Sequence, residues 1–349
     1  MENKRIPYID VAAGILILWM IFQHAVQSAW LIGSSSPGEM YAWNPNVWFP
    51  YLNFFMPWFF YKSGAFFQKR SIKDLLVKDY RKLMRTFLIW SLVGYMFYLL
   101  LGVYDHTLTL HDALYTPTRR FFFYGFIAIN SPLWFLITLI GVRFVANILL
   151  PQNDDQYKHY KYAAIVLCGA LIAFGCHVYD NPLVPLWVAN GAAGLAFFTI
   201  GYWLHNYERC TWLLIPCVLG YIISCILGWN SVCMQTNELL DGYYLLWFPS
   251  ALCGIICFNA VCGYLCEWIG KIPPPPHYSR VRTLEAIGKN AMPIYVTHSF
   301  VRFPIQTILV VSNFSLSWQW VLAIICVGYA IVLPIVCVLS NKIGKMKTK

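Results

Sequence analysis

Charge is what this sequence has least of. Only 11% of its 349 residues are Asp, Glu, Lys or Arg, whereas about a quarter are charged in ordinary soluble domains. Hydrophobic residues make up 59%, and the mean hydropathy is +0.57. This balance excludes a soluble domain of the same length, because too little polar surface is present to cover it. We therefore expect an all-α, polytopic membrane protein. The aromatic content of 18% suits belts at two membrane interfaces.

Paired cysteine motifs are also missing. Most of the 12 Cys lie inside apolar runs, no CxxC occurs, and no nearby His completes a zinc-binding set. Only Cys233 and Cys176 fall on the side that we expect to be external, so the pattern supports no disulfide framework. We treat these residues as small hydrophobes and expect neither a metal nor a bound cofactor.

Carboxylates are absent from the middle of the apolar segments. Asp10 and Glu267 are the two carboxylates within these segments, and each lies near an end. A proton relay usually places Asp or Glu in mid-span, so this absence argues against proton coupling. His24, His298 and Arg302 do lie within apolar segments. Cations without counter-ions in such a place predict an anionic ligand.

Ten apolar segments are each long enough for a membrane span of about 20 residues, and we treat residues 1–349 as one transmembrane domain. The predicted spans are 9–31, 47–67, 83–103, 132–150, 162–178, 187–206, 211–229, 244–269, 291–311 and 317–340. An even number of spans places both termini on one side. Of the 25 basic residues, 20 fall on that side, and the loops opposite carry only Arg119 and Arg120. By the positive-inside rule the termini are cytoplasmic. The net charge of +10 then needs no nucleic acid to explain it.

Two connecting segments carry their own signals. The longest outer loop, 104–131, is expected to hold a short amphipathic helix near the outer surface. The sequence KIPPPPHYSR at 271–280 predicts a stiff, polyproline-like linker on the inner side.

His24 lies on one face of the first span together with Ala13 and Gln27, by 3–4 spacing. At about 1.5 Å per residue it is roughly 20 Å from Asp10, past the bilayer middle. An isolated intramembrane histidine is either a packing residue bonded to a neighbouring helix or a functional group. In the ninth span His298 and Arg302 are one turn apart, between prolines that imply bends.

Five stretches, in this order, resemble the acyltransferase 3 family of integral-membrane acyltransferases, with the fucose 4-O-acetylase-like branch nearest. They are YIDVAAGILILWMIFQH (8–24), FFMPWFFYKSGAFF (54–67), KDYRKLMRTFLIW (78–90), SPLWFLITL (131–139) and LEAIGKNAMPIYVTH (284–298). The resemblance covers nearly the whole chain. It implies an O-acyltransferase of the bacterial inner membrane that moves an acyl group, usually acetyl from cytoplasmic acetyl-CoA, to a glycan or lipid-linked sugar.

The resemblance also assigns residues. It implies His24 as the presumed catalytic base, His298 as the second histidine, Ser63 as the serine of the Ser-Gly motif, and Arg81, Lys82 and Arg85 as the basic patch after the second span. From their positions within the spans we add Arg302 and Gln27, with Ser63, as candidates for acceptor positioning or oxyanion stabilisation, and Lys62 and Arg143 as candidates for donor binding. The family's usual cation eleven residues before the histidine is replaced here by Ala13. We hypothesise that Lys62 substitutes for it, although Lys62 lies close enough to the inner surface to snorkel.

A sugar hydroxyl needs a base to attack a thioester, and a neutral imidazole can take its proton. Two acyl routes stay open: a pantetheine arm reaching through the bundle, or a covalent relay on Ser63. A carrier or flippase for an anionic or sugar-lipid substrate is the alternative function. A third reading is a sensory or structural membrane protein. The sequence does not indicate the acceptor or the oligomeric state.

Overall fold

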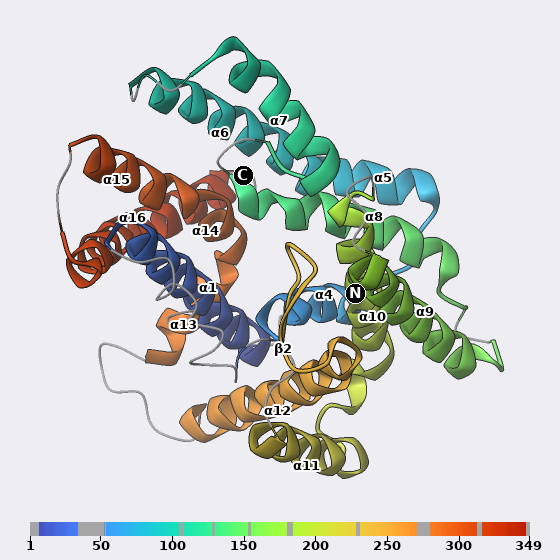
Figure 1. The fold of residues 1–349 in the computed structure, drawn as a ribbon. Helices are drawn as coiled ribbons and strands as arrows, with labels where there is room; N and C mark the ends of the chain where they lie inside the picture. Colours follow the sequence, from blue (N-terminus) through green and yellow to red (C-terminus); the bar gives the residue numbers. More distant parts are fainter. Residues whose placement is uncertain are drawn as a thin grey trace. The chain divides into compact units, whose positions relative to one another are not determined.

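The structure is a computed structural model that describes residues 7–33, 52, 54–104, 106, 108–127, 130–152, 155–179, 184–227, 231–270, 280–312 and 316–346. The chain divides into two compact units, one made of residues 1–52 and 258–349 and the other of residues 53–257. Figure 1 gives the helix labels used below.

Helices dominate both units. The first unit contains α1 (Pro7–Gly33), α13 (Arg280–Lys289), α14 (Ala291–Thr297), α15 (Ser299–Val311) and α16 (Trp318–Met346). The second contains α4 (Phe55–Ala65), α5 (Ile72–Asp79), a π-helix (Tyr80–Met84), α6 (Arg85–Tyr104), α7 (Leu110–Tyr124), a 3₁₀ turn (Ser131–Leu133), α8 (Trp134–Leu149), α9 (Lys158–Tyr179), α10 (Leu186–Leu204), a 3₁₀ turn (His205–Tyr207) and α11 (Thr211–Leu227). A small hairpin of β1 (Ser231–Cys233) and β2 (Glu238–Asp241) follows, and α12 (Tyr244–Gly270) begins in this unit and continues past the boundary at residue 257.

Six described helices are long and apolar enough to cross a membrane, which makes the chain a multi-pass membrane protein. They cover Pro7–Ala29, Ile72–Tyr104, Ser131–Leu149, Lys158–Tyr179, Tyr244–Trp268 and Trp318–Ser340. The all-α prediction is confirmed. The number of ten spans and the side of the termini remain predictions.

Most predicted spans coincide with helices, and three differ in form or length. The span predicted at 291–311 is two helices, α14 and α15, joined at His298. The span predicted at 83–103 begins earlier, because α5, the π-helix and α6 run on without a gap from Ile72 to Tyr104. The second predicted span, 47–67, corresponds to the 11-residue α4, and residues 47–51 lie outside the described part.

In the first unit, α1 packs on α13 through backbone contact between glycines and main chain (Figure 1). A Cβ placed on Gly14 would come within 2.2 Å of the Leu284 carbonyl oxygen, and one on Gly288 within 1.7 Å of the Asp10 carbonyl oxygen. Only glycine permits so close an approach. These contacts hold the N-terminal half of α1, the helix that carries His24, against α13.

In the second unit, α4 crosses α10 by the same means. A Cβ on Gly64 would lie 1.9 Å from the Phe198 carbonyl oxygen, and one on Gly201 would lie 2.0 Å from the Tyr61 carbonyl oxygen. The Tyr61 hydroxyl donates to the Glu208 carboxylate at 2.7 Å and ties α4 to the residue that follows the 3₁₀ turn after α10. Gly64, the glycine of the Ser-Gly pair in the second predicted span, therefore has a packing role.

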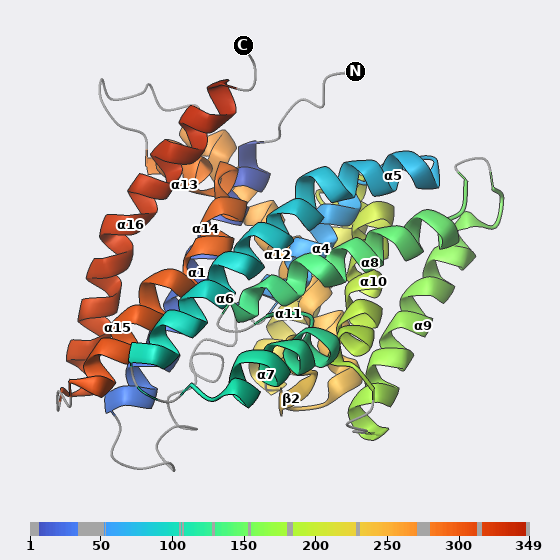
Figure 2. The same cartoon turned by 90° about the horizontal axis from the view of Figure 1, so that it is seen from above.

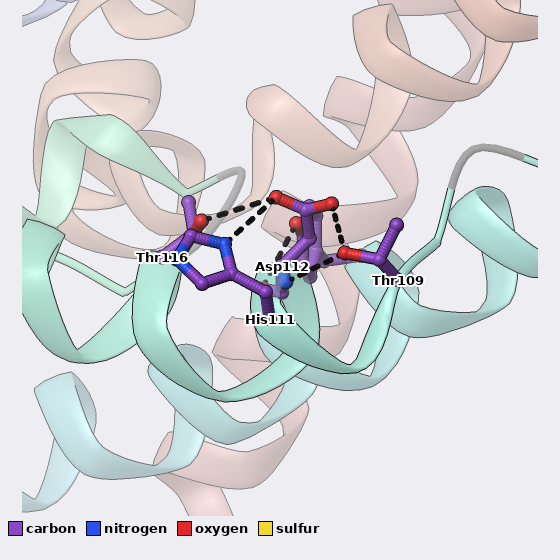
Figure 3. A network of polar contacts seen from close by, with 5 residues as sticks. Thr109, His111, Asp112 and Thr116 are labelled. Carbon is purple, nitrogen blue, oxygen red and sulfur yellow. Dashed lines mark hydrogen bonds and ion pairs between the residues drawn. The ribbon is translucent and has the colours of Figure 1, made fainter.

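The amphipathic helix expected within 104–131 is α7, which lies along α6 (Figure 2). The Tyr95 hydroxyl of α6 donates to the Ala113 carbonyl of α7 at 2.9 Å. Thr109 caps α7: its hydroxyl accepts from the Asp112 amide and donates to the Asp112 carboxylate (Figure 3). The Thr109 hydroxyl lowers the pKa of Asp112 because it donates a hydrogen bond to the ionised carboxylate.

Candidate active site

Two histidines far apart in the sequence meet in the first unit. The ring of His24, on α1, stacks on the ring of His298 with centroids 5.2 Å apart and an interplanar angle of 23°. His298 is fully buried, and His24 is partly exposed. Gln27, one turn beyond His24, is within hydrogen-bonding reach of the His24 ring. The two predicted catalytic histidines are therefore direct neighbours.

The hydrogen bonds of His298 assign its tautomer. Its Nδ1 lies 2.7 Å from the carbonyl oxygen of Tyr295, which can only accept, so Nδ1 carries the proton. In the neutral ring Nε2 then holds a lone pair. That atom is buried and has no hydrogen-bond partner in the described part of the chain; the same is true of Nδ1 of His24. Both ring nitrogens are therefore available to hydrogen-bond a substrate.

The helix break at His298 has identifiable causes. The His298 carbonyl accepts from the Val301 amide at 3.1 Å, a tighter i−3 bond at the junction. Pro304 has no amide hydrogen and cannot donate to the Phe300 carbonyl just beyond the junction. The carbonyl of His298 accepts from the Tyr329 hydroxyl of α16 at 3.2 Å. Tyr329 thus anchors the backbone of the catalytic candidate.

Arg302 completes the cluster as a buried cation, with only 8% of its surface exposed. Its Nη1 donates to the Ser28 hydroxyl at 3.1 Å, and its guanidinium lies 4.4 Å from the ring centre of Phe303. Its Nε has no partner among the described residues, and none of their carboxylates forms an ion pair with it. A buried guanidinium without a counter-ion favours an oxyanion or another anionic group.

Ser28 was missed by sequence reasoning, although a signal was available. It follows His24 by four residues and so lies on the same helix face. Tyr329 gave no such signal, because only tertiary packing brings α16 to this junction.

The predicted residues of α4 lie in the second unit. The Ser63 hydroxyl donates to the Phe59 carbonyl at 2.8 Å, a local bond within the helix. The Lys62 ammonium lies 5.3 Å from the ring centre of Trp58. In the described contacts Ser63 has no base beside it, as a covalent relay would require.

The predicted basic residues divide into two kinds. Arg81 and Lys82 lie in the π-helix and Arg85 at the start of α6, and all three are exposed. Arg143 instead pairs with Asp79, its Nε lying 3.0 and 2.9 Å from the two carboxylate oxygens. Both members of the pair are largely buried, with the Arg143 side chain 15% and the Asp79 side chain 6% exposed. The geometry gives Arg143 a structural partner and leaves Arg81, Lys82 and Arg85 available to a ligand.

An imidazole pair with unpartnered nitrogens, next to a buried guanidinium in a bundle of apolar helices, can take a proton and hold a developing negative charge. This chemistry fits a group-transfer enzyme of the membrane. The chain belongs to the acyltransferase 3 family, whose acyltransferase-domain model matches residues 6–339. No curated protein and no solved structure matches it. The predicted family is thereby confirmed and makes this chain a membrane acyltransferase; the fucose 4-O-acetylase-like branch remains a prediction.

Proposed function

We propose that this protein is an O-acyltransferase of the bacterial inner membrane. It takes an acyl group, acetyl by preference, from cytoplasmic acyl-CoA and delivers it to a sugar hydroxyl of a cell-surface glycan or lipid-linked glycan precursor. The observation that carries the proposal is the stacked pair of His24 and His298 beside Arg302. Family membership supports the reaction class.

In the proposed reaction, His24 accepts the proton of the attacking hydroxyl through its unpartnered Nδ1. The hydroxyl oxygen then bonds to the thioester carbon, and the carbonyl oxygen becomes an oxyanion. Arg302 donates to that oxyanion through Nε. When the intermediate collapses, the carbon–sulfur bond breaks and the imidazolium returns its proton to the thiolate of CoA. His298 uses its Nε2 to orient either the acceptor or the His24 ring.

The donor's phosphates are proposed to bind Arg81, Lys82 and Arg85. The π-helix Tyr80–Met84 supports this role, because a π-helical segment interrupts the regular α-helix and changes the direction of the side chains that it carries. Ordinary cytoplasmic retention of positive charge accounts for the same residues without a ligand. Donor affinity at varied ionic strength separates the two readings.

A carrier or flippase for an anionic or sugar-lipid substrate is the second candidate, and the observation that favours it is the buried Arg302, which has no counter-ion among the described residues. The discriminating experiment uses the purified full chain in liposomes with acetyl-labelled acetyl-CoA. An acyltransferase releases CoA, slowly to water and faster once an acceptor glycan is added. A carrier releases none.

The acceptor is sought in cells. Mass analysis of surface glycans from a host with and without the gene is expected to show the loss of one acetyl group per modified sugar. Cells that carry His24→Ala are expected to match cells without the gene, whereas the exposed His111→Ala is the matched control. Unchanged glycans, together with no CoA release in liposomes, would refute the proposed function.

A further inference from the structure

A cavity of about 580 Å³ lies between α8, α9 and α10 in the second unit, and none of the residues assigned above lines it. Its size falls within the roughly 300–1,000 Å³ typical of ligand sites. Its walls come from all three helices and contain no charged side chain. The lining residues include Gly141 and Val145 of α8, Gly169 and Ile172 of α9, and Trp187 and Gly191 of α10.

Glycines create this cavity. A Cβ built on Gly141 or on Gly191 meets no atom within 4 Å, so both positions open onto free space. Gly169 has the opposite role, since a Cβ there would come within 2.7 Å of the Ala192 carbonyl oxygen. Gly169 therefore brings α9 against α10, while Gly141 and Gly191 hollow the wall.

The surroundings identify the class of ligand. α8 and α9 are both among the helices that can cross a membrane, so the cavity lies at the depth of the hydrocarbon core. Its rim is open, with Val145 38% and Ile172 52% exposed. A further membrane helix, about 10 Å wide and 30 Å long, would need roughly 2,000 Å³ and does not fit. A single hydrocarbon chain reaching through one leaflet, about 15 Å, does fit.

One end of the cavity is marked by polar and cationic groups. The Trp187 indole donates to the Phe122 carbonyl in the last turn of α7 at 2.9 Å. Arg119 and Arg120 lie within one turn of Phe122, whereas the acidic residue of α7, Asp112, is in its first turn. This end therefore carries positive charge where a lipid phosphate would emerge.

We propose that the cavity binds one hydrocarbon chain of an anionic bilayer phospholipid, whose phosphate lies against the Arg119–Arg120 end of α7. The glycine-hollowed wall surrounds the chain on three sides, and the bound lipid fills space that would otherwise lose van der Waals contacts. The lipid is a resident part of this unit and is independent of the acyl-transfer chemistry.

The test uses the full chain in liposomes that contain phosphatidylglycerol with a photoreactive diazirine in mid-chain. Peptide mapping after illumination is expected to place the label on α8, α9 and α10. The double variant Gly141→Leu/Gly191→Leu fills the cavity and is expected to lose most of this labelling. Gly175→Leu is the matched control, because Gly175 on α9 also has open space at its Cβ but does not line the cavity.

A second arm tests the headgroup. The same diazirine on phosphatidylcholine is expected to label more weakly, and Arg119→Gln/Arg120→Gln should remove the preference for the anionic lipid. If the double leucine variant does not fold, Gly191→Leu alone must still lower the labelling. Three outcomes overturn the proposal: unchanged labelling in a folded leucine variant, equal labelling of all lipid-facing helices, or capture of a second copy by a photoreactive residue at Ile172.

Discussion

The imidazole planes of His24 and His298 lie within 23° of parallel, with 5.2 Å between their centroids. Two rings at this distance cannot both hold a proton at low cost in a buried site, because two like charges repel strongly there. The pair is therefore suited to hold one proton at a time, which is what a base that later returns its proton must do.

The first prediction concerns the two ring nitrogens. His24→Ala is expected to reduce acyl transfer by about 10²–10⁴-fold, the usual contribution of a general base. His298→Asn keeps a donor for the Tyr295 carbonyl but lacks Nε2, and it should be as inactive as His298→Ala while remaining folded. The measurement is CoA release from acetyl-CoA. Full activity in His298→Asn would show that Nε2 has no part in the reaction.

The second prediction concerns the buried cation. Arg302→Met should lower kcat by roughly 10²–10³-fold, as expected when an oxyanion donor is lost. Ser28→Ala removes the hydrogen bond to Nη1 but keeps the cation, and it should lower kcat by less, about 10-fold or about 1.4 kcal/mol. Kinetics on both variants check this order. A Ser28→Ala effect confined to thermal stability would instead make the serine a packing residue.

The third prediction separates structural from ligand-binding cations. Arg143→Gln leaves the Asp79 carboxylate buried without its partner and should destabilise the protein by about 3–5 kcal/mol. Adding Asp79→Asn should restore much of that stability. Arg81→Gln/Lys82→Gln should leave thermal unfolding unchanged and raise the KM for acyl-CoA, most clearly at low salt. An unfolding temperature that falls equally in both sets would contradict this division.

The fourth prediction tests the crossing of α4 and α10. Gly64→Ala or Gly201→Ala forces the two backbones apart and should destabilise the fold by about 1–3 kcal/mol or more. Gly175→Ala has open space and should be neutral or slightly stabilising, since alanine favours a helix. Thermal unfolding in one detergent compares the three. Equal midpoints would show that the close contact is relieved without strain.

The sequence predicted the helices and the two histidines because both signals are local. Hydropathy sets the length of an apolar helix, and a histidine inside one is conspicuous by itself. The break at His298 was only partly foreseeable: the prolines indicated a bend but not its position. The partners of Arg302 and Arg143 could not be foreseen, since Ser28 and Asp79 lie 274 and 64 residues away. Such pairings depend on how helices pack, which no local pattern records.

The π-helix at Tyr80–Met84 has one more consequence. It contains an extra residue relative to an α-helical turn. The rotation of α5 relative to α6, the two halves of the 33-residue helix Ile72–Tyr104, therefore depends on the number of residues between them. Deleting a single residue there would close the ordinary hydrogen-bond ladder and rotate Asp79 by about 100° about the axis, away from Arg143. A deletion in this segment would therefore require a compensating change in α8 to keep the ion pair, whereas a substitution that keeps its length would not.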